Sequence, residues 1–208
     1  MSRGARLTTT SYAVLCLLGV KESWSTYELT RQMDRSLGRI WPRAVSKLYE
    51  EPKKLVAHGL ASACQEQVGK RPRTVYSITD EGRRALAEWV AEPGAGPVLE
   101  FEQLLKITFS EFGSRSDALA AVEAARAWAE ERNEENLATA RAYLAGEAPF
   151  QRRAAQTMIG GRFLTDFYRM VAEWADWARH VVEQWPDDPR DAQPDVPEFE
   201  EIVRRADW

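Results

Sequence analysis

Cysteine and histidine are scarce in this chain of 208 residues, which contains two of each. Cys16 and Cys64 stand in apolar surroundings far apart in the sequence, so we interpret them as buried free thiols rather than as a disulfide. His58 and His180 have no cysteine or carboxylate at the spacing of a metal site. The sequence therefore predicts no metal site.

Long apolar runs and catalytic motifs are also missing. The longest apolar run, residues 12–20, is about half of the ~20 residues that a membrane-spanning helix needs. Phosphate-binding glycine motifs and the GxSxG nucleophile motif are absent. The acidic pairs at 130–131 and 134–135 suit a solvated helix surface. We therefore expect a cytoplasmic protein that has no membrane segment, binds no cofactor and is not an enzyme.

The net charge of −4 hides an uneven distribution of charged residues. Residues 1–92 hold 15 Lys and Arg against 10 Asp and Glu, a net charge of +5. Residues 93–208 hold 13 against 22, a net charge of −9. A basic N-terminal part followed by an acidic remainder favours a DNA-binding domain joined to a body that does not bind DNA.

The first 40 residues contain two helical patterns. Residues 8–11 offer N-cap side chains for a short and almost entirely apolar helix that ends near Gly19. Ser25 and Glu28 have the spacing of a capping box, so a second helix should run to about Leu37. Three of its residues should face the core: Tyr27, Leu29 and Met33.

A third helical pattern, within residues 41–60, organises the N-terminal region. Its buried face should consist of Val45, Leu48, Tyr49, Leu55 and Val56, with Pro52 in the same stripe. Its polar face should consist of Arg43, Ser46, Lys47, Glu50 and Lys54. A short helix with such a polar front suits the major groove of DNA. Proline lacks a backbone N–H, so Pro52 should kink this helix or raise its second half.

After Gly59 the pattern changes to that of a β-hairpin. Residues 60–68 and 74–78 predict two short strands, and residues 79–82 should cap a fourth helix. A basic hairpin beside a DNA-reading helix is typical of a wing that lies along phosphates, although a turn is often charged simply because it is solvated. The turn carries three cations: Lys70, Arg71 and Arg73.

Five segments of the N-terminal region carry a resemblance to a known family. They are LTTTSYAVLCLLG (7–19), TYEL (26–29), KLY with KKL (47–49 and 53–55), HGL (58–60) and RTVYSITDEGRRAL (73–86). Together they resemble the winged-helix domain of PadR-family transcriptional regulators. The resemblance implies double-stranded DNA as a partner and a dimer formed by C-terminal helices. It also permits a small aromatic effector, because some members are known as sensors of phenolic acids or drugs.

We place the domain boundary at the Pro- and Gly-rich segment 93–97. Residues 1–92 should form a winged helix-turn-helix DNA-binding domain, and residues 98–186 a helical dimerisation domain. The Pro- and Asp-rich tail, 187–208, should begin as an extended mobile linker and end in a short amphipathic helix. The predicted fold class is mainly α with a small β-hairpin wing.

The helices beyond the boundary carry apolar seams that one protomer cannot cover. Gly160 and Gly161 either interrupt the last long helix or allow a neighbour to approach closely. A second copy is the simplest partner, and a homodimer would hold two reading heads at the spacing of an inverted repeat. The predicted dimerisation residues are Phe101, Leu104, Leu105, Phe167, Met170, Trp174, Trp177 and Val181.

Eight tryptophans are a high number for this length, and several lie on the predicted dimer-forming helices. Flat apolar side chains can bind a planar aromatic effector, and Trp89 is the predicted ligand residue. The alternative is ordinary core and interface packing.

The sequence thus favours a homodimeric DNA-binding regulator, more specifically a repressor. The alternative is a helical protein-interaction adaptor that keeps a winged helix but does not read DNA. The predicted DNA-contacting residues are Arg43, Ser46, Lys47, Tyr49, Lys70, Arg71 and Arg73.

Overall fold

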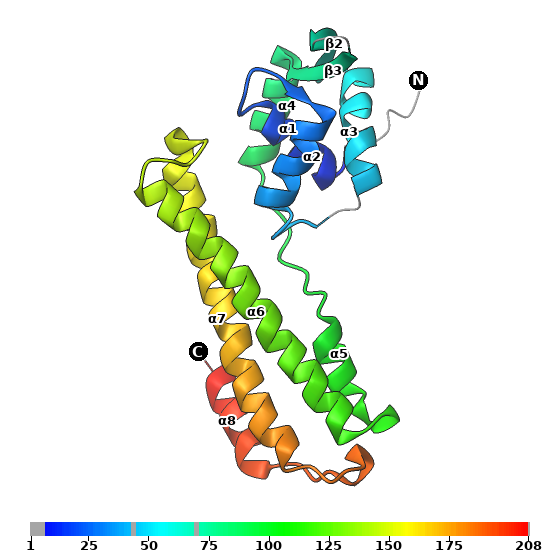
Figure 1. The fold of residues 1–208 in the computed structure, drawn as a ribbon, viewed down its shortest axis with the longest axis vertical. Helices are drawn as coiled ribbons and strands as arrows, with labels where there is room; N and C mark the ends of the chain where they lie inside the picture. Colours follow the sequence, from blue (N-terminus) through cyan, green and yellow to red (C-terminus); the bar gives the residue numbers. More distant parts are fainter. Residues whose placement is uncertain (1–6, 43–44, 69–70, 208) are drawn as a thin grey trace. The chain divides into compact units, whose positions relative to one another are not determined.

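The computed structural model of the chain describes residues 7–42, 45–68 and 71–207. The chain folds as two compact units, Met1–Pro97 and Val98–Trp208 (Figure 1). The first unit combines helices with a small antiparallel sheet, and the second is built from helices. This arrangement confirms the predicted fold class.

The first unit follows the predicted order of elements. They are α1 (Thr9–Leu18), β1 (Trp24–Ser25), α2 (Thr26–Gln32), α3 (Val45–Ala57), β2 (Ala61–Val68), β3 (Arg71–Ile78) and α4 (Asp80–Ala91). A π-helical segment, Met33–Leu37, extends α2 to its predicted end. The sheet has the order β1-β3-β2, in which the two-residue β1 was not expected from the sequence.

Side-chain caps determine where the helices of this unit begin. The predicted capping box of α2 is present: the Glu28 N–H donates to Ser25 Oγ at 3.3 Å, and the Ser25 N–H donates to Glu28 Oε2 at 2.8 Å. That backbone bond, together with the Lys21 ammonium at 2.9 Å, lowers the pKa of Glu28 to about 2. A local sequence signal therefore marks the start of this helix.

Two glycines allow the hairpin and α4 to follow α3 closely. Gly59 ends α3 with a φ of 71°, a conformation that other residues rarely adopt. A side chain at Gly82 would lie 2.1 Å from the carbonyl oxygen of Leu60, so only glycine fits there. Thr79 completes the junction, because its hydroxyl donates to the Gly59 carbonyl at 2.7 Å.

Three sequence-based assignments in this unit are wrong. Tyr27 was expected in the core but is 62% exposed, because it lies on the outer side of α2. Tyr49 was placed on the buried face of the third helix but is 43% exposed. Cys64 is a free thiol as predicted, yet it is exposed on β2 rather than buried, whereas Cys16 is half-buried.

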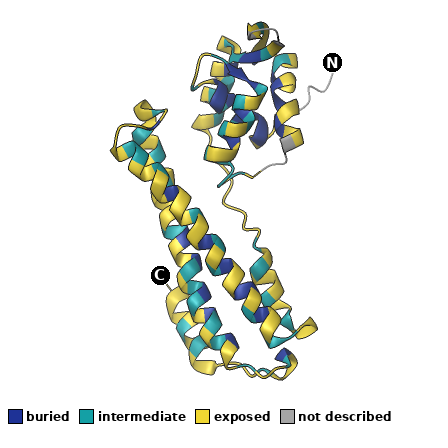
Figure 2. Cartoon of the chain, in the orientation of Figure 1, coloured by how far each residue is buried: buried dark blue, intermediate teal, exposed yellow. Residues whose placement is uncertain are grey.

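The second unit is dominated by two long helices. Its elements are α5 (Glu102–Thr108), α6 (Arg115–Leu144), α7 (Ala154–Glu183) and α8 (Val196–Ala206), with 3-10 turns at Ser110–Phe112, Gln151–Arg153 and Pro189–Asp191. Small buried residues line the facing sides of α6 and α7, which allows a close antiparallel approach (Figure 2). Ala118, Val122, Ala175, Ala178 and Val182 form the core of this pairing.

Gly160 and Gly161 do not interrupt α7, which is continuous from Ala154 to Glu183. In this protomer no atom lies close to where a side chain on either glycine would be. The tail begins differently from the predicted mobile linker: it contains a 3-10 turn, and Asp187 binds Arg115 at 2.7 Å. Its final amphipathic helix, α8, is present as predicted.

Candidate nucleic-acid interface

The front of α3 is the polar surface that the sequence predicts. The side chains of Ser46, Lys47 and Tyr49 are exposed there, together with the acidic Glu50. Tyr49 is exposed, so it is not a core residue, but its exposure is compatible with its predicted contact with DNA. Arg43, the remaining predicted base contact, lies outside the described residues, as does the side chain of Val45.

The back of α3 attaches this helix to the core. Leu48 and Leu55 are buried as predicted, and Pro52 is among the fully buried residues. The helix runs through Pro52 without a break, from Val45 to Ala57. Pro52 is thus accommodated inside a continuous helix and packs in the core, although proline cannot donate a backbone hydrogen bond.

The wing differs from its predicted shape. Arg71 and Arg73 belong to strand β3, where Arg73 pairs with Glu66 across the hairpin, so they are not turn residues. The guanidinium of Arg73 binds the carboxylate of Glu66 at 3.0 Å. This bond offsets one of the cations expected to meet phosphate. Lys70 and the side chain of Arg71 lie outside the described residues.

Glu51, on the inner side of α3, is a buried carboxylate that was not predicted from the sequence. Glu51 is 3% exposed, and its Oε2 accepts a hydrogen bond from the Ser11 hydroxyl of α1 at 2.8 Å. Its Oε1 binds the ammonium of Lys54 at 2.8 Å, which raises the pKa of Lys54. Glu51 comes three residues after Leu48 and four before Leu55, so helical periodicity would have placed it on the buried face.

Trp89 is not an open platform for a ligand. Its ring stacks on that of Tyr12, with centroids 4.9 Å apart and planes 7° from parallel. This contact joins α4 to α1 and covers one face of the indole. Trp89 nevertheless stays half-buried rather than fully enclosed.

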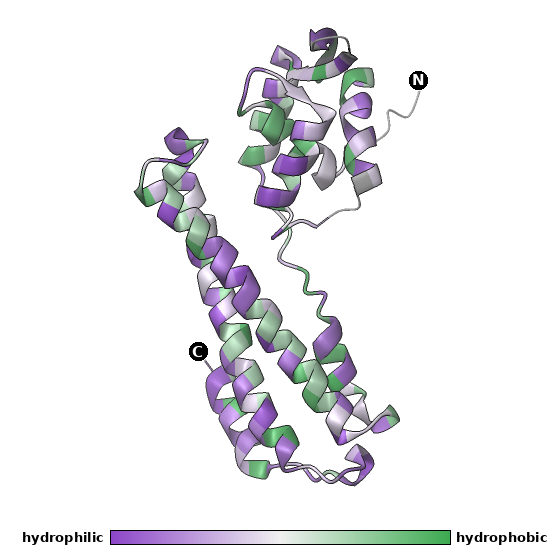
Figure 3. Cartoon of the chain, in the orientation of Figure 1, coloured by the Kyte–Doolittle hydropathy of each residue, from purple (hydrophilic) through white to green (hydrophobic). Residues whose placement is uncertain are grey.

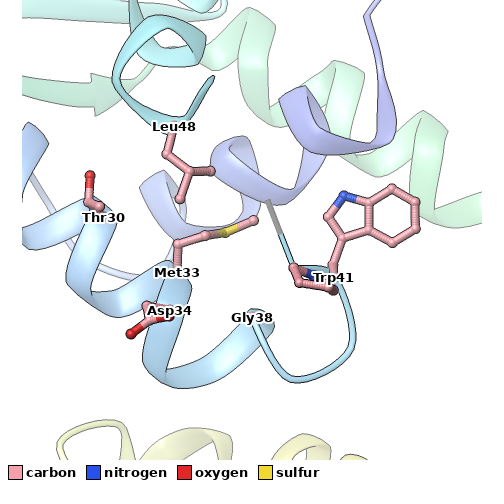
Figure 4. Close-up of a pocket in the computed structure, with 7 residues that line it drawn as sticks. Thr30, Met33, Asp34, Gly38, Trp41 and Leu48 are labelled. Carbon is pink, nitrogen blue, oxygen red and sulfur yellow. The ribbon is translucent and has the colours of Figure 1, made fainter. Parts of the chain in front are cut away.

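A small pocket lies beside the start of α3, and its volume is about 90 Å³ (Figure 4). Met33 and Leu48 point toward one another across it, with Asp34 and Thr30 on one side and Trp41 on the other. A cavity that binds benzene has a volume of about 150 Å³. This pocket is therefore too small for a planar aromatic effector.

The predicted dimerisation residues fall into two groups in the second unit. Leu104, Leu105, Met170 and Trp177 are exposed, whereas Phe101, Phe167, Trp174 and Val181 are half-buried within the protomer. The rings of Phe101 and Trp174 meet edge to face at 5.5 Å, and Phe167 contacts Trp128 at 6.2 Å. The half-buried group thus supports the fold of this unit.

Apolar residues recur along the whole of α7 (Figure 3). Exposed members lie seven residues apart at Phe163, Met170 and Trp177, and the exposed Ile159 extends the same side. Met158 is also exposed. The predicted dimerisation residues include Met170 and Trp177 but neither Met158 nor Ile159. Ile159 precedes Phe163 by four residues, a helical spacing that could have placed it on the same side.

Among the residues that the structure describes, no group of three or more His, Cys, Asp or Glu side chains is arranged to hold a metal ion. No helix in the same residues is long and apolar enough to cross a membrane.

Comparisons with known proteins agree with this geometry. Residues 14–88 match the model of the transcriptional regulator PadR-like family. This stretch is a PadR-like domain. It contains all of α3 and the wing, and with them every predicted DNA-contacting residue.

Two curated relatives are similar to part of this chain. A probable transcriptional regulator of Mycobacterium tuberculosis is 35% identical over 83 residues, which are 39% of this chain and 43% of the relative. The negative transcriptional regulator PadR of Bacillus subtilis is 32% identical over 109 residues, which are 51% of this chain and 59% of the relative. The chain thus spans about half the length of the curated relatives it matches.

The likeness of folds extends beyond the PadR-like domain. The crystal structure of Bacillus subtilis PadR in complex with operator DNA matches with a TM-score of 0.72 at 20% identity, over 86% of this chain and 99% of that one. The same protein in complex with p-coumaric acid matches with a TM-score of 0.65 at 21% identity, over 85% of this chain and all of that one. The helical second unit therefore belongs to the shared fold.

Proposed function

We propose that this protein is a transcriptional repressor that binds an inverted-repeat DNA operator as a homodimer. The observation that carries the proposal is the polar front of α3, which displays Ser46, Lys47 and Tyr49 inside a PadR-like domain. The net charge of +5 over residues 1–92 supports attraction to the phosphate backbone. The match to a negative transcriptional regulator supports repression rather than activation of transcription.

In this proposal α3 enters the major groove and the wing follows the flanking backbone. Ser46, Lys47 and Tyr49 contact base edges, together with Arg43. Three cations of the wing contact phosphates: Lys70, Arg71 and Arg73.

A salt series with two variants tests this division of roles. Lys47→Ala should lower the affinity for the operator by about 1–3 kcal/mol and relax the preference for one base. Lys70→Ala should weaken binding to every duplex alike and reduce the salt slope by about one unit. Lys106→Ala, in the second unit, is the matched control and should bind as the wild type does. Equal binding by all four proteins would overturn the assignment.

The homodimer is supported by the exposed side of α7. Phe163, Met170 and Trp177 place large apolar groups in solvent at the spacing of a helix-pairing seam. Exposed Leu104 and Leu105 of α5 add further apolar surface. A second copy would cover these residues and would hold two copies of α3 one helical turn of DNA apart.

Release by a small planar aromatic compound completes the proposal, with Trp89 as the contact residue. Its support is the half-buried indole on α4 and the complex of Bacillus subtilis PadR with p-coumaric acid. Titration of the protein–DNA complex with p-coumaric acid tests it. Dissociation of the wild type but not of Trp89→Leu is the expected result, and no dissociation by this or related phenolic acids would remove the effector from the proposal.

A further inference from the structure

Two neighbouring polar residues of α1 are buried: Thr10 is 8% exposed and Ser11 is 4% exposed. Buried hydroxyl groups nearly always have hydrogen-bond partners. The partner of Thr10 precedes α3 in the chain, and the partner of Ser11 lies within α3. The Trp41 Nε1–H donates to Thr10 Oγ1 at 3.2 Å. The Ser11 hydroxyl donates to the Glu51 carboxylate at 2.8 Å. The two bonds therefore hold the chain just before α3 and the middle of α3 to one turn of α1.

The direction of the hydrogen bond between Ser11 and Glu51 is defined by its neighbours. The backbone N–H of Thr8 donates to Ser11 Oγ at 3.1 Å, which leaves the hydroxyl hydrogen for the carboxylate. The second oxygen of Glu51 is bound by the ammonium of Lys54. The buried charge is thus satisfied from both sides, and burying a carboxylate is costly without such partners.

Apolar packing alone does not determine how α3 is rotated about its axis. Leu48, Pro52 and Leu55 hold the helix against the core, but apolar contacts have no strong directional preference. Hydrogen bonds do have strict distance and angle requirements. Productive recognition tolerates displacements of only about 0.5 Å and rotations of about 10–20°. Directional hydrogen bonds on the buried side of α3 would therefore hold the exposed side chains of this helix in position for recognition.

We propose that Thr10 and Ser11 are positioning residues for DNA recognition. Through Trp41 and Glu51 they fix the rotation and height of α3, so that its exposed side chains meet base edges in the correct register. They contact no DNA themselves. This inference rests on the proposed function, and it assigns sequence discrimination to buried residues of α1 as well as to the residues on the polar front.

The test uses the full-length protein and two probes: the duplex that the wild type selects from a random library, and a duplex of unrelated sequence. Thr10→Val removes the hydroxyl that accepts from Trp41, and Ser11→Ala removes the hydroxyl that donates to Glu51 and accepts from the Thr8 N–H, each at nearly constant shape. Thr9→Val is the matched control, because Thr9 is the exposed neighbour of Thr10 on the same helix.

Thr10→Val and Ser11→Ala should lower the ratio of specific to unrelated affinity about five- to tenfold each, which corresponds to the loss of one hydrogen bond, to Trp41 or to Glu51. Binding to the unrelated duplex and the salt slope should stay at wild-type values. Thr9→Val should keep the wild-type ratio. Thr10→Ser and Ser11→Thr retain a hydroxyl and should recover much of the wild-type ratio of specific to unrelated affinity. All measurements are made well below each variant's melting temperature.

The outcomes separate this inference from the function on which it rests. If the wild type selects no duplex, the proposed function fails. If the wild type selects a duplex but Thr10→Val and Ser11→Ala keep its ratio, the positioning role is overturned while DNA recognition stands. A parallel loss of specific and unrelated binding also overturns it, since that result indicates a general loss of folded protein. An equal loss of the affinity ratio in Thr9→Val would also overturn the positioning role.

Discussion

The ring of Tyr12 lies face to face with the ring of Trp89 and joins α1, the first helix of the first unit, to α4, its last. The stack is adjacent in sequence to Thr10 and Ser11, which bind Trp41 just before α3 and Glu51 within α3. Residues 10–12 thus connect α3 with α4, the helix that precedes the second unit in the chain. A ligand that displaced Tyr12 from Trp89 would act on the same turn of α1 that holds α3.

The stack should be measurable as a coupling free energy. Tyr12→Leu and Trp89→Leu each remove an aromatic contact worth about 0.5–1.5 kcal/mol beyond the burial of area. A double-mutant cycle, followed by urea unfolding, should therefore give a coupling of this size between the two positions. Strict additivity of the two single substitutions would show that the rings do not interact in solution.

A second prediction concerns the bond between Glu66 and Arg73 in the wing. Glu66→Gln should release Arg73 and remove a negative charge near the phosphates. The affinity for any duplex should rise up to about fivefold, because an exposed ion pair contributes about 0.2–1 kcal/mol. Fluorescence anisotropy at several salt concentrations measures the effect, and the salt slope should become steeper as Arg73 binds phosphate.

Glu81→Gln provides the control for the wing variant. Glu81 is also exposed and paired with an arginine, Arg84, but it lies on α4 rather than on the wing. It should raise the affinity much less than Glu66→Gln. Weaker DNA binding by Glu66→Gln would mean that Glu66 orients Arg73 for DNA instead of withholding it.

The elements that the sequence predicted well are those with local signals. The capping box of Ser25 and Glu28, the cap at Thr79 and the helix stop at Gly59 each need only a few neighbouring residues, and all are present. The general positions of the helices and the hairpin followed from these signals and from apolar periodicity.

Features that depend on distant parts of the chain were not predictable in the same way. Ser11 and Glu51 are 40 residues apart, so no local pattern joins them. The start of β3 at Arg71 is set by pairing with β2, which overrides the turn propensity of the Gly- and Pro-containing segment. Tyr49 was misassigned because an apolar stripe shows which face of a helix is apolar, but not at which residue the buried part of that face ends. The roles of the DNA-contacting residues stay a prediction.

The acid stability of the protein should depend on Glu28. Its pKa is lowered to about 2 by the Ser25 N–H, then by the Lys21 ammonium and the Ser25 hydroxyl. A carboxylate whose folded pKa lies below its ordinary value of 4.5 stabilises the folded state above that pH, and this contribution is lost as the pH falls toward 2. Glu28→Gln should therefore flatten the unfolding free energy over this range and cost about 1 kcal/mol at neutral pH.

Chemical denaturation between pH 2 and pH 7 measures this contribution. Lys21→Met removes one cause of the low pKa but keeps the capping box, so its profile should lie between those of the wild type and Glu28→Gln. Identical pH profiles for wild type and Glu28→Gln would contradict the assignment.

A fourth prediction concerns Asn136, a buried amide in the long helical pair of the second unit. Its side chain donates to the Gly161 carbonyl at 3.1 Å and to the Thr165 hydroxyl at 2.8 Å. Asn136→Ala should lower the free energy of unfolding of this unit by about 1–3 kcal/mol, because it removes both hydrogen bonds of a buried side chain between α6 and α7. Asn133→Ala, at an exposed position on the same helix, is the control and should change stability by under about 0.5 kcal/mol. Thermal unfolding followed by circular dichroism distinguishes the two, and equal shifts would contradict a role for the amide.

The last prediction tests whether the exposed side of α7 is the surface that a second copy covers. Met170 lies midway between Phe163 and Trp177 on this side and is exposed in the protomer. Met170→Lys should cost the folded protomer little, since a solvated position accepts a charge, but it would place two like charges across a two-fold interface. Sedimentation equilibrium should show a dimer for the wild type and a shift toward monomer for this variant, with unchanged helix content. Glu183→Lys, an exposed position elsewhere on α7, should remain dimeric. A Met170→Lys dimer of wild-type strength would move the interface away from this side, and the exposed apolar seam would then need a different partner.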